Sequence, residues 1–229
     1  MRIEIWSDIV CPWCAIGKAQ LEAALAEFEH ADGVDVVWRS FELDPGAPAV
    51  REGDYAAMLA SKYGTSLAGG QAMIARMTEA AADAGLGFDL ERARPGNSFD
   101  AHRLAHLAAD HGRQSAVVQR LMRGYLSEGE AIGDPATLLR LAADAGLEPD
   151  QVRDTLDSDA YADAVRAEEH EALELGVTAV PLFLLDRRLA IPGAQPVEMM
   201  LQALRRATRE RDPAAARDTP VHRVDREAR

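Results

Sequence analysis

Cysteine is scarce in this sequence, which holds only Cys11 and Cys14 among 229 residues. A framework of structural disulfides needs more thiols, and a structural zinc site needs four ligands, so two neighbouring cysteines fit neither well. A Cys11–Cys14 bond would close a very short loop, and in the chain-entropy model the stabilisation from a crosslink grows with loop length. The pair is therefore expected to perform chemistry rather than to fasten the fold, and no metal site is expected.

Basic charge and long apolar runs are also lacking. The chain has 25 Lys and Arg against 38 Asp and Glu, a net charge of −13, whereas binding to a phosphate backbone needs a basic surface. No segment approaches the roughly 18 uninterrupted apolar residues of a membrane span. Nucleic acids and membranes are therefore not expected partners. Because the chain begins without a basic stretch followed by an apolar leader, a cytoplasmic location is expected.

Aromatic residues make up only 5% of the chain, whereas alanine and leucine are abundant, which favours a helix-rich globular protein. The first segments predict a strand over Arg2–Ser7, a helix from the cysteines to about Glu29, and a second strand over Val34–Leu43. Such a βαβ unit is expected to be right-handed, with its two strands parallel.

The rest of the chain divides into a helical block and a return to strands. Residues 180–186 and 189–192 predict a hairpin, and residues 197–209 predict a closing helix. We therefore expect an α/β, thioredoxin-like fold (βαβ…ββα) with an inserted all-helical domain. Residues 1–44 and 176–211 would together form a discontinuous thioredoxin-like domain. Residues 45–175 would form the helical insertion domain, and residues 212–229 a flexible tail. Within the insertion, helices are predicted near residues 55–63, 68–84, 99–111, 115–126, 135–145, 150–156 and 160–175.

The cysteine positions predict different roles for the two thiols. Cys11 would lie at the N-terminus of the first helix, where unpaired backbone N–H groups and the helix dipole favour a thiolate. Cys14, one turn into the helix, would be more buried and would suit a resolving thiol that attacks a mixed disulfide. Pro12 fits the first helical turn, where its missing N–H has no partner in any case. Trp13 would offer a flat surface to a substrate.

Val180 and Pro181 form the second element of this pattern. A proline that opens a strand is unremarkable by itself. In combination with a Cys-x-x-Cys after the first strand, a cis Val180–Pro181 bond would present the Val180 backbone to an extended peptide beside the thiols.

The motif around the cysteines resembles the active-site segment of the DsbA-like thioredoxin-fold oxidoreductases, most closely the FrnE-type branch. The resemblance covers about residues 3–207 and implies dithiol-disulfide exchange, with Cys11 attacking, Cys14 resolving, Pro181 as the cis-proline, and Asn97 and His102 facing the thiol cleft. Some FrnE-type proteins carry a second cysteine pair that this sequence lacks, so electrons would come from another molecule. The matching segments are residues 7–18, 97–104, 128–129, 176–183 and 193–195.

Other functions stay open from the sequence. A glutathione-like, thiol-dependent isomerase or transferase of the 2-hydroxychromene-2-carboxylate isomerase or kappa-class glutathione transferase type is one alternative, although those enzymes use serine at the position of Cys11. A non-catalytic binding or chaperone-like module is another. No cofactor is expected beyond the Cys11–Cys14 disulfide, with protein or peptide thiols and disulfides, or a small thiol, as reaction partners. A monomer or loose dimer is expected.

Two polar residues near the motif also have more than one interpretation. Asp8 could influence proton transfer at Cys14, or it could simply stabilise the turn between strand and helix. His102 and His106, four residues apart on one predicted helix, could chelate a metal, but such a pair more often forms the polar edge of a helix.

Overall fold

The protein is represented by a computed structural model that describes residues 1–51 and 53–211. Strand β1 (Arg2–Ser7), helix α1 (Pro12–Ala26), the short 3-10 helix η1 (Ala31–Gly33) and strand β2 (Asp35–Ser40) form the predicted βαβ unit. Helix α1 ends three residues earlier than the apolar pattern predicted, and β2 is shorter at both ends. The predicted tail 212–229 lies outside the described residues.

The position of β1 in the sheet explains why this strand is so apolar. Within the described residues it has four strands in the order β2-β1-β3-β4, so β1 is central and covered on both faces. It runs parallel to β2, with Ser7 opposite Ser40, and antiparallel to β3 (Leu182–Leu185). Strand β4 (Leu189–Pro192) completes the hairpin with β3. This topology confirms the expected thioredoxin-like α/β fold.

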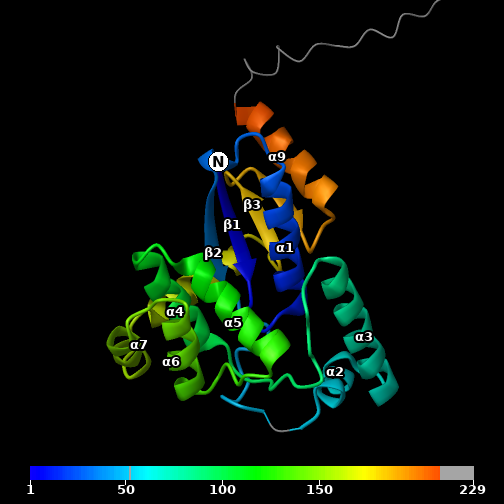
Figure 1. The fold of residues 1–229 in the computed structure, drawn as a ribbon, viewed down its shortest axis with the longest axis vertical. Coiled ribbons are helices and arrows are strands. Elements are labelled where there is room, and N and C mark those ends of the chain that lie inside the picture. The colour runs from blue at the N-terminus through cyan, green and yellow to red at the C-terminus, as the bar shows by residue number, and fades with distance from the viewer. Residues whose placement is uncertain (52, 212–229) are drawn as a thin grey trace, which may run out of the picture.

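Helices cover both faces of this sheet. Helix α1 packs beside α9 (Val197–Arg211), and Figure 1 shows both helices next to the strands in the upper part of the molecule. The other face carries α8 (Ala162–Glu174), where the indole N–H of Trp6 donates a hydrogen bond to the Glu168 carbonyl oxygen at 3.2 Å. The cysteine loop at the end of β1 therefore points toward the helical part below.

The elements between β2 and β3 are helices, as the alanine-rich sequence predicted, and their ends lie within two residues of the predicted ones. Asp54, Ser66 and Asp134 each accept a hydrogen bond from a backbone N–H in the first turn of the helix that follows, as N-caps do. Before α8 these helices are α2 (Tyr55–Tyr63), α3 (Leu67–Asp83), α4 (Phe99–Asp110), α5 (Gln114–Glu128), α6 (Pro135–Asp144) and α7 (Pro149–Leu156). Among the described residues, none of the helices is long and apolar enough to cross a membrane.

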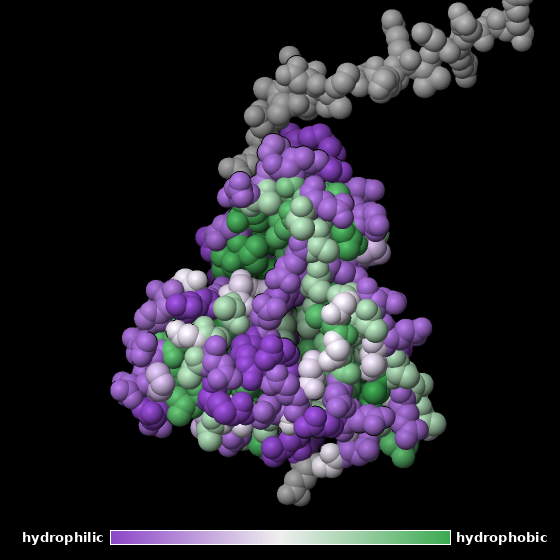
Figure 2. Space-filling model, in the orientation of Figure 1, coloured by the Kyte–Doolittle hydropathy of each residue, from purple (hydrophilic) through white to green (hydrophobic). Residues whose placement is uncertain are grey.

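The sheet and the helical segment share one hydrophobic core. Ile5 and Cys14 belong to the same buried cluster as Leu104 on α4 and Leu121 on α5. In Figure 2 the visible surface is mostly hydrophilic, and hydrophobic residues gather where the sheet lies. The continuous core fixes the position of the cysteine loop against the helices, which the site requires.

A buried ionic cluster also ties the two parts together. Arg39 on β2 forms ion pairs with Glu4 on β1 and, at 2.8 Å, with Glu168 on α8. Burial alone would raise the pKa of Glu168, but His106 and Arg39 outweigh it and lower that pKa to about 2. His106 lies 3.1 Å from the Glu168 carboxylate. The carboxylate is therefore ionised in the folded protein over nearly the whole pH range.

Candidate active site

Cys11 is the N-cap residue of α1, and Cys14 lies one turn further along the helix. Cys11 has an extended backbone conformation, and its carbonyl oxygen accepts the Cys14 N–H at 3.1 Å. Pro12 occupies the first turn, where no partner for a backbone N–H is needed. Both cysteines are free thiols in this structure. The strand-to-helix turn thus brings the two sulfur atoms to one end of the sheet.

The two thiols have different surroundings. Both are buried, Cys14 at 1% and Cys11 at 4% exposed, and they differ in the groups around them. Burial, followed by the interaction with Cys11, raises the pKa of the Cys14 thiol well above its ordinary value, while the Ser7 hydroxyl and the Asp8 backbone act in the opposite direction. Cys14 is therefore a protonated thiol at neutral pH, as suits a residue that reacts second.

Val180 and Pro181 lie directly beside the cysteines. The Cys11 thiol is 3.9 Å from the carbonyl oxygen of Val180, to which it can donate, and the Val180–Pro181 peptide bond is cis. Gly17 allows α1 to approach this segment: a Cβ atom there would lie 3.0 Å from Phe183 Cζ and 3.1 Å from Pro181 Cγ. Sequence reasoning did not single out Gly17, because its reason is a contact with a segment more than 160 residues away.

Asp8 stabilises the turn and also connects it to the helical segment. Its carboxylate accepts the Leu43 N–H at 2.7 Å and the Val10 N–H at 3.3 Å, and it lies 3.5 Å from His102 Nε2. Burial alone would raise the pKa of Asp8, but His102 and the Leu43 N–H stabilise the carboxylate and hold that pKa below its ordinary value. Asp8 is therefore a buried anion close to the thiol pair.

The two residues predicted to face the thiol cleft from the helical segment, His102 on α4 and Asn97 just before it, are both engaged with neighbouring side chains. His102 is 3% exposed and points at Asp8 rather than into open space. The side-chain amide of Asn97 donates to Glu42 at 3.1 Å and accepts the Phe99 N–H at 2.8 Å, so it holds the loop before α4. Both residues contact neighbours of the site, and a role in substrate binding stays a prediction for each.

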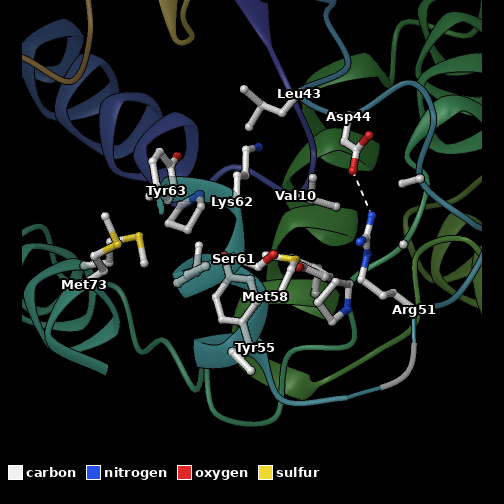
Figure 3. Close-up of a pocket in the computed structure, with 18 of the residues that line it drawn as sticks. Val10, Leu43, Asp44, Arg51, Tyr55, Met58, Ser61, Lys62, Tyr63 and Met73 are labelled. Carbon is white, nitrogen blue, oxygen red and sulfur yellow. Dashed lines mark hydrogen bonds and ion pairs between the residues drawn. The ribbon is translucent and has the colours of Figure 1, made fainter. Parts of the chain in front are cut away.

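A cavity of about 680 Å³ opens beside the cysteines, a size that suits a small ligand or a substrate side chain. Figure 3 shows how α2 and α3 turn their side chains toward it, with Arg51 held by Asp44 at 2.9 Å. Val10, Pro12 and Trp13 line the side next to the thiols, and the opposite wall includes Met58, Lys62 and Met73.

Positive charge stands out in this cavity because the chain as a whole is acidic. Lys62 and Arg76 line it, and among the described residues neither forms an ion pair with a carboxylate. The Arg76 guanidinium instead lies over the Trp13 ring at 5.6 Å, a cation–π geometry. Asp44 already pairs with Arg51, and the Asp54 side chain caps α2. The two unpaired cations favour a ligand that carries negative charge.

Two buried tyrosines were not predicted as part of the site. Tyr55 on α2 and Tyr125 on α5 line the cavity and are at most 5% exposed. Burial, followed by the nearby charge of Cys11, raises the pKa of Tyr55, and burial likewise raises the pKa of Tyr125. Both phenols therefore stay protonated near Cys11. Neither is close to the cysteines in the sequence, so only the packing reveals them.

No set of three or more His, Cys, Asp or Glu side chains in residues 1–51 and 53–211 has the arrangement of a metal site. His102 and His106 point to different carboxylates, those of Asp8 and Glu168. The arrangement offers thiol chemistry, because the Cys11 thiol at the N-terminus of α1 lies beside a backbone carbonyl, a second thiol lies one turn further along the helix, and a cavity adjoins the turn.

The family model of the DSBA-like thioredoxin domain matches residues 2–205 of this chain. The protein is also similar to a solved structure from Streptomyces coelicolor that is described as a probable DsbA oxidoreductase. The two are 45% identical, with a TM-score of 0.86, and the match covers 100% of this chain and 95% of that chain.

Likeness of fold extends to two further structures. A 2-hydroxychromene-2-carboxylate isomerase is 16% identical with a TM-score of 0.68, over 92% of this chain and 98% of that chain. The cytosolic disulfide reductase DsbM from Pseudomonas aeruginosa, with GSH, is 19% identical with a TM-score of 0.64, over 91% and 100%. At these identities the likeness concerns the fold alone.

Proposed function

Because this chain belongs to the DSBA-like thioredoxin domain family, we propose that it is a thiol-disulfide oxidoreductase that works through Cys11 and Cys14. The observation that carries the proposal is the asymmetry of the two thiols. Cys11 lies at the N-terminus of α1, 3.9 Å from the Val180 carbonyl oxygen, whereas Cys14 lies one turn further along the helix and has a raised pKa. One thiol is placed to meet a substrate and the other to react afterwards.

The exchange proceeds in two successive displacements at sulfur. The Cys11 thiolate attacks one sulfur of a substrate disulfide, a mixed disulfide forms, and the other substrate sulfur leaves as a thiolate. Cys14 then loses its proton and attacks the Cys11 sulfur, which forms the Cys11–Cys14 bond and releases the second substrate thiolate. The substrate is thereby reduced and the protein is oxidised. The same steps in reverse oxidise a substrate dithiol, and another molecule must restore the starting state of the pair.

The surroundings of the thiols support two kinds of substrate. The backbone of Val180 beside Cys11 suits an extended peptide, whose own backbone would run past the thiol, with Pro12 and Trp13 contacting its side chains. The adjoining cavity suits a small thiol or disulfide. We therefore propose protein or peptide thiols as substrates and a low-molecular-weight thiol as a co-substrate.

A thiol-dependent isomerase or transferase is the second candidate function. The observation in its favour is the cavity with the unpaired cations Lys62 and Arg76, which would hold an acidic thiol together with an organic electrophile. The structural likeness to a 2-hydroxychromene-2-carboxylate isomerase concerns the same fold. The cysteines at positions 11 and 14 favour exchange instead, because an isomerase of that type has no need of a resolving thiol.

We also propose a cytoplasmic location, where a reducing environment would keep Cys11 and Cys14 available as thiols. The similar fold of a reductase described as cytosolic supports this proposal.

Single-turnover reduction of a disulfide-linked fluorescent peptide tests the proposed function. Cys11→Ser is expected to abolish the reaction, and Cys14→Ser is expected to accumulate a mixed disulfide between Cys11 and the peptide, which mass spectrometry identifies. Normal turnover in Cys11→Ser would refute the proposal. Isomerase activity would appear as thiol-dependent conversion of an electrophile that survives Cys14→Ser. A binding or chaperone-like module would protect an unfolded protein from aggregation equally well with either substitution.

A further inference from the structure

A second cavity, of about 330 Å³, lies between α1, α5 and the loop that follows α3. In Figure 1 these three segments meet in the middle of the molecule. The cavity shares no lining residue with the one beside the cysteine turn, and the proposed exchange uses none of its groups. Its volume lies at the lower end of the range for pockets that hold small molecules.

The walls of this cavity are fixed by backbone hydrogen bonds. The Asp89 N–H donates to the carbonyl oxygen of Leu126 on α5 at 2.8 Å, and the Leu86 N–H donates to the Ala81 carbonyl oxygen at the end of α3, also at 2.8 Å. The loop is therefore held against α5 without a ligand, as is usual for small-molecule sites. The large apolar side chains that line the cavity are those of Leu86, Phe88, Met122 and Leu126.

Lys18 on α1 places a buried ammonium group at this apolar lining. Its side chain is 8% exposed, and its Nζ atom lies 2.6 Å from the carboxylate of Glu22, whose side chain is 56% exposed. An ammonium carries three N–H donors, and Lys18 has no second hydrogen bond among the described residues. Because buried donors are nearly always paired, the other two need acceptors from water or from a ligand. An ammonium only donates, so a ligand atom that meets Lys18 must be an acceptor.

The charges around the cavity balance one another. Arg123 pairs with Glu128 at 2.8 Å, as Lys18 does with Glu22, and the other lining residues are uncharged. An anion would meet two carboxylates and a cation would meet two basic groups, so the lining favours an uncharged ligand.

Two neutral polar side chains of α5 complete the lining, the Gln119 amide and the Ser127 hydroxyl. Within the part of the chain that the structure describes, neither forms a hydrogen bond, so both are available to a ligand. A few polar groups over an apolar surface are the usual composition of a small-molecule site, in which the polar groups fix the orientation of the ligand.

We propose that this cavity binds an uncharged small molecule with an aromatic or aliphatic body and a carbonyl group that accepts a hydrogen bond from Lys18. The body lies against Phe88 and Met122, and the small side chains of Ala15 and Ala19 on α1 leave room for it. A carbonyl oxygen accepts but does not donate, which matches the ammonium. This site is independent of the proposed exchange function, since it uses neither cysteine and no group of the cavity beside them.

Titration of the full-length protein with prodan, a neutral naphthalene ketone, tests the proposal. Its fluorescence emission moves to shorter wavelength in an apolar site, and saturable binding of one molecule per chain is expected. An analogue in which a methylene group replaces the carbonyl has the same body without the acceptor, and its competition with prodan gives its affinity. No binding of prodan to the native protein would overturn the proposal.

Lys18→Met keeps an apolar side chain of similar length and removes the donor. It is expected to weaken prodan binding by about tenfold and to leave the affinity for the methylene analogue unchanged, because only the ketone loses a hydrogen bond to a charged group. Glu22 stays hydrated in this variant, since its side chain is more than half exposed. An equal change for both ligands would contradict the role of Lys18.

Two substitutions locate the bound probe. Ala19→Trp fills the proposed site and should abolish prodan binding, whereas Ala57→Trp fills the cavity beside the cysteines and should bind prodan as the native protein does. Urea denaturation checks that both variants are folded. Unchanged binding in Ala19→Trp, or loss of binding in Ala57→Trp, would overturn the assignment of the site.

A crystal structure of the native protein with prodan gives a test that needs no variant. The ketone oxygen is expected within hydrogen-bond distance of Lys18 Nζ, with the naphthalene ring against Phe88. Prodan bound elsewhere, or with its ketone turned away from Lys18, would contradict the proposal.

Discussion

The guanidinium of Arg76 lies over the indole ring of Trp13, 5.6 Å from its centre, so helix α3 contacts the residue between the two cysteines. The contact holds a positive charge beside the thiols of an acidic protein. Because Arg76 forms no ion pair with a carboxylate among the described residues, its charge is available to a substrate.

Arg76→Gln is therefore expected to slow reaction with the anionic disulfide dithiodiglycolate by about threefold to tenfold and to speed reaction with cationic cystamine. Neutral hydroxyethyl disulfide should react as before, and added salt should reduce the differences. Second-order rate constants for the three disulfides measure the effect. Arg206→Gln, on the exposed face of α9, is the control. Equal changes for all three disulfides would show that the charge of Arg76 does not select substrates.

Gly17→Ala should weaken both the fold and the exchange reaction. The new Cβ atom would press on Phe183 and Pro181 and push α1 away from the segment that meets Cys11. Overpacking of this kind costs about 1–3 kcal/mol in the free energy of unfolding. Urea denaturation measures that cost. The rate at which Cys11 reacts with the aromatic disulfide DTNB measures the effect on the exchange reaction. Gly33→Ala, where a Cβ atom would meet nothing within 4 Å, should be close to neutral, so equal losses in both variants would contradict the packing argument.

The ionic cluster around Glu168 predicts how stability depends on acid. The folded state lowers the pKa of Glu168 from 4.5 to about 2, so the stabilisation is complete above pH 4.5 and disappears as the pH falls toward 2. A shift of this size corresponds to about 3 kcal/mol. Glu168→Gln should therefore lower the free energy of unfolding at pH 7 and flatten its decline between pH 5 and pH 2. Parallel pH profiles for the two proteins would argue against this role of Glu168.

The raised pKa of Cys14 predicts its resistance to alkylation. Its largest cause is burial, which does not depend on Cys11, so Cys14 in the Cys11→Ser variant should stay unmodified by iodoacetamide even near its ordinary pKa of 9.0. Mass spectrometry of the quenched reaction measures the modified fraction. The same variant unfolded in guanidinium is the control and should react fully. Rapid alkylation of folded Cys11→Ser would show that Cys14 is accessible.

Local chemistry in the sequence was enough to predict the fold and to propose the thiol turn as the centre of the site. Hydrophobic periodicity located the strands and helices to within a few residues, because each pattern depends on neighbours along the chain. The residues 11–14 and the Val180–Pro181 step identified the thiol turn and the segment that would meet it. The parallel pairing of the first two strands followed from the rules for βαβ connections.

Contacts between distant segments were decided only by the tertiary structure. Asp8 meets His102, Gly17 meets Phe183, and Tyr55 and Tyr125 reach the neighbourhood of Cys11 because helices pack at particular angles and distances. No local pattern encodes those angles, so a buried tyrosine or histidine looks like any other core residue. The sequence by itself determined the order of strands and helices and predicted which residues would carry the chemistry; packing decided which polar groups surround Cys14 and whether a charged cavity opens beside the cysteine turn.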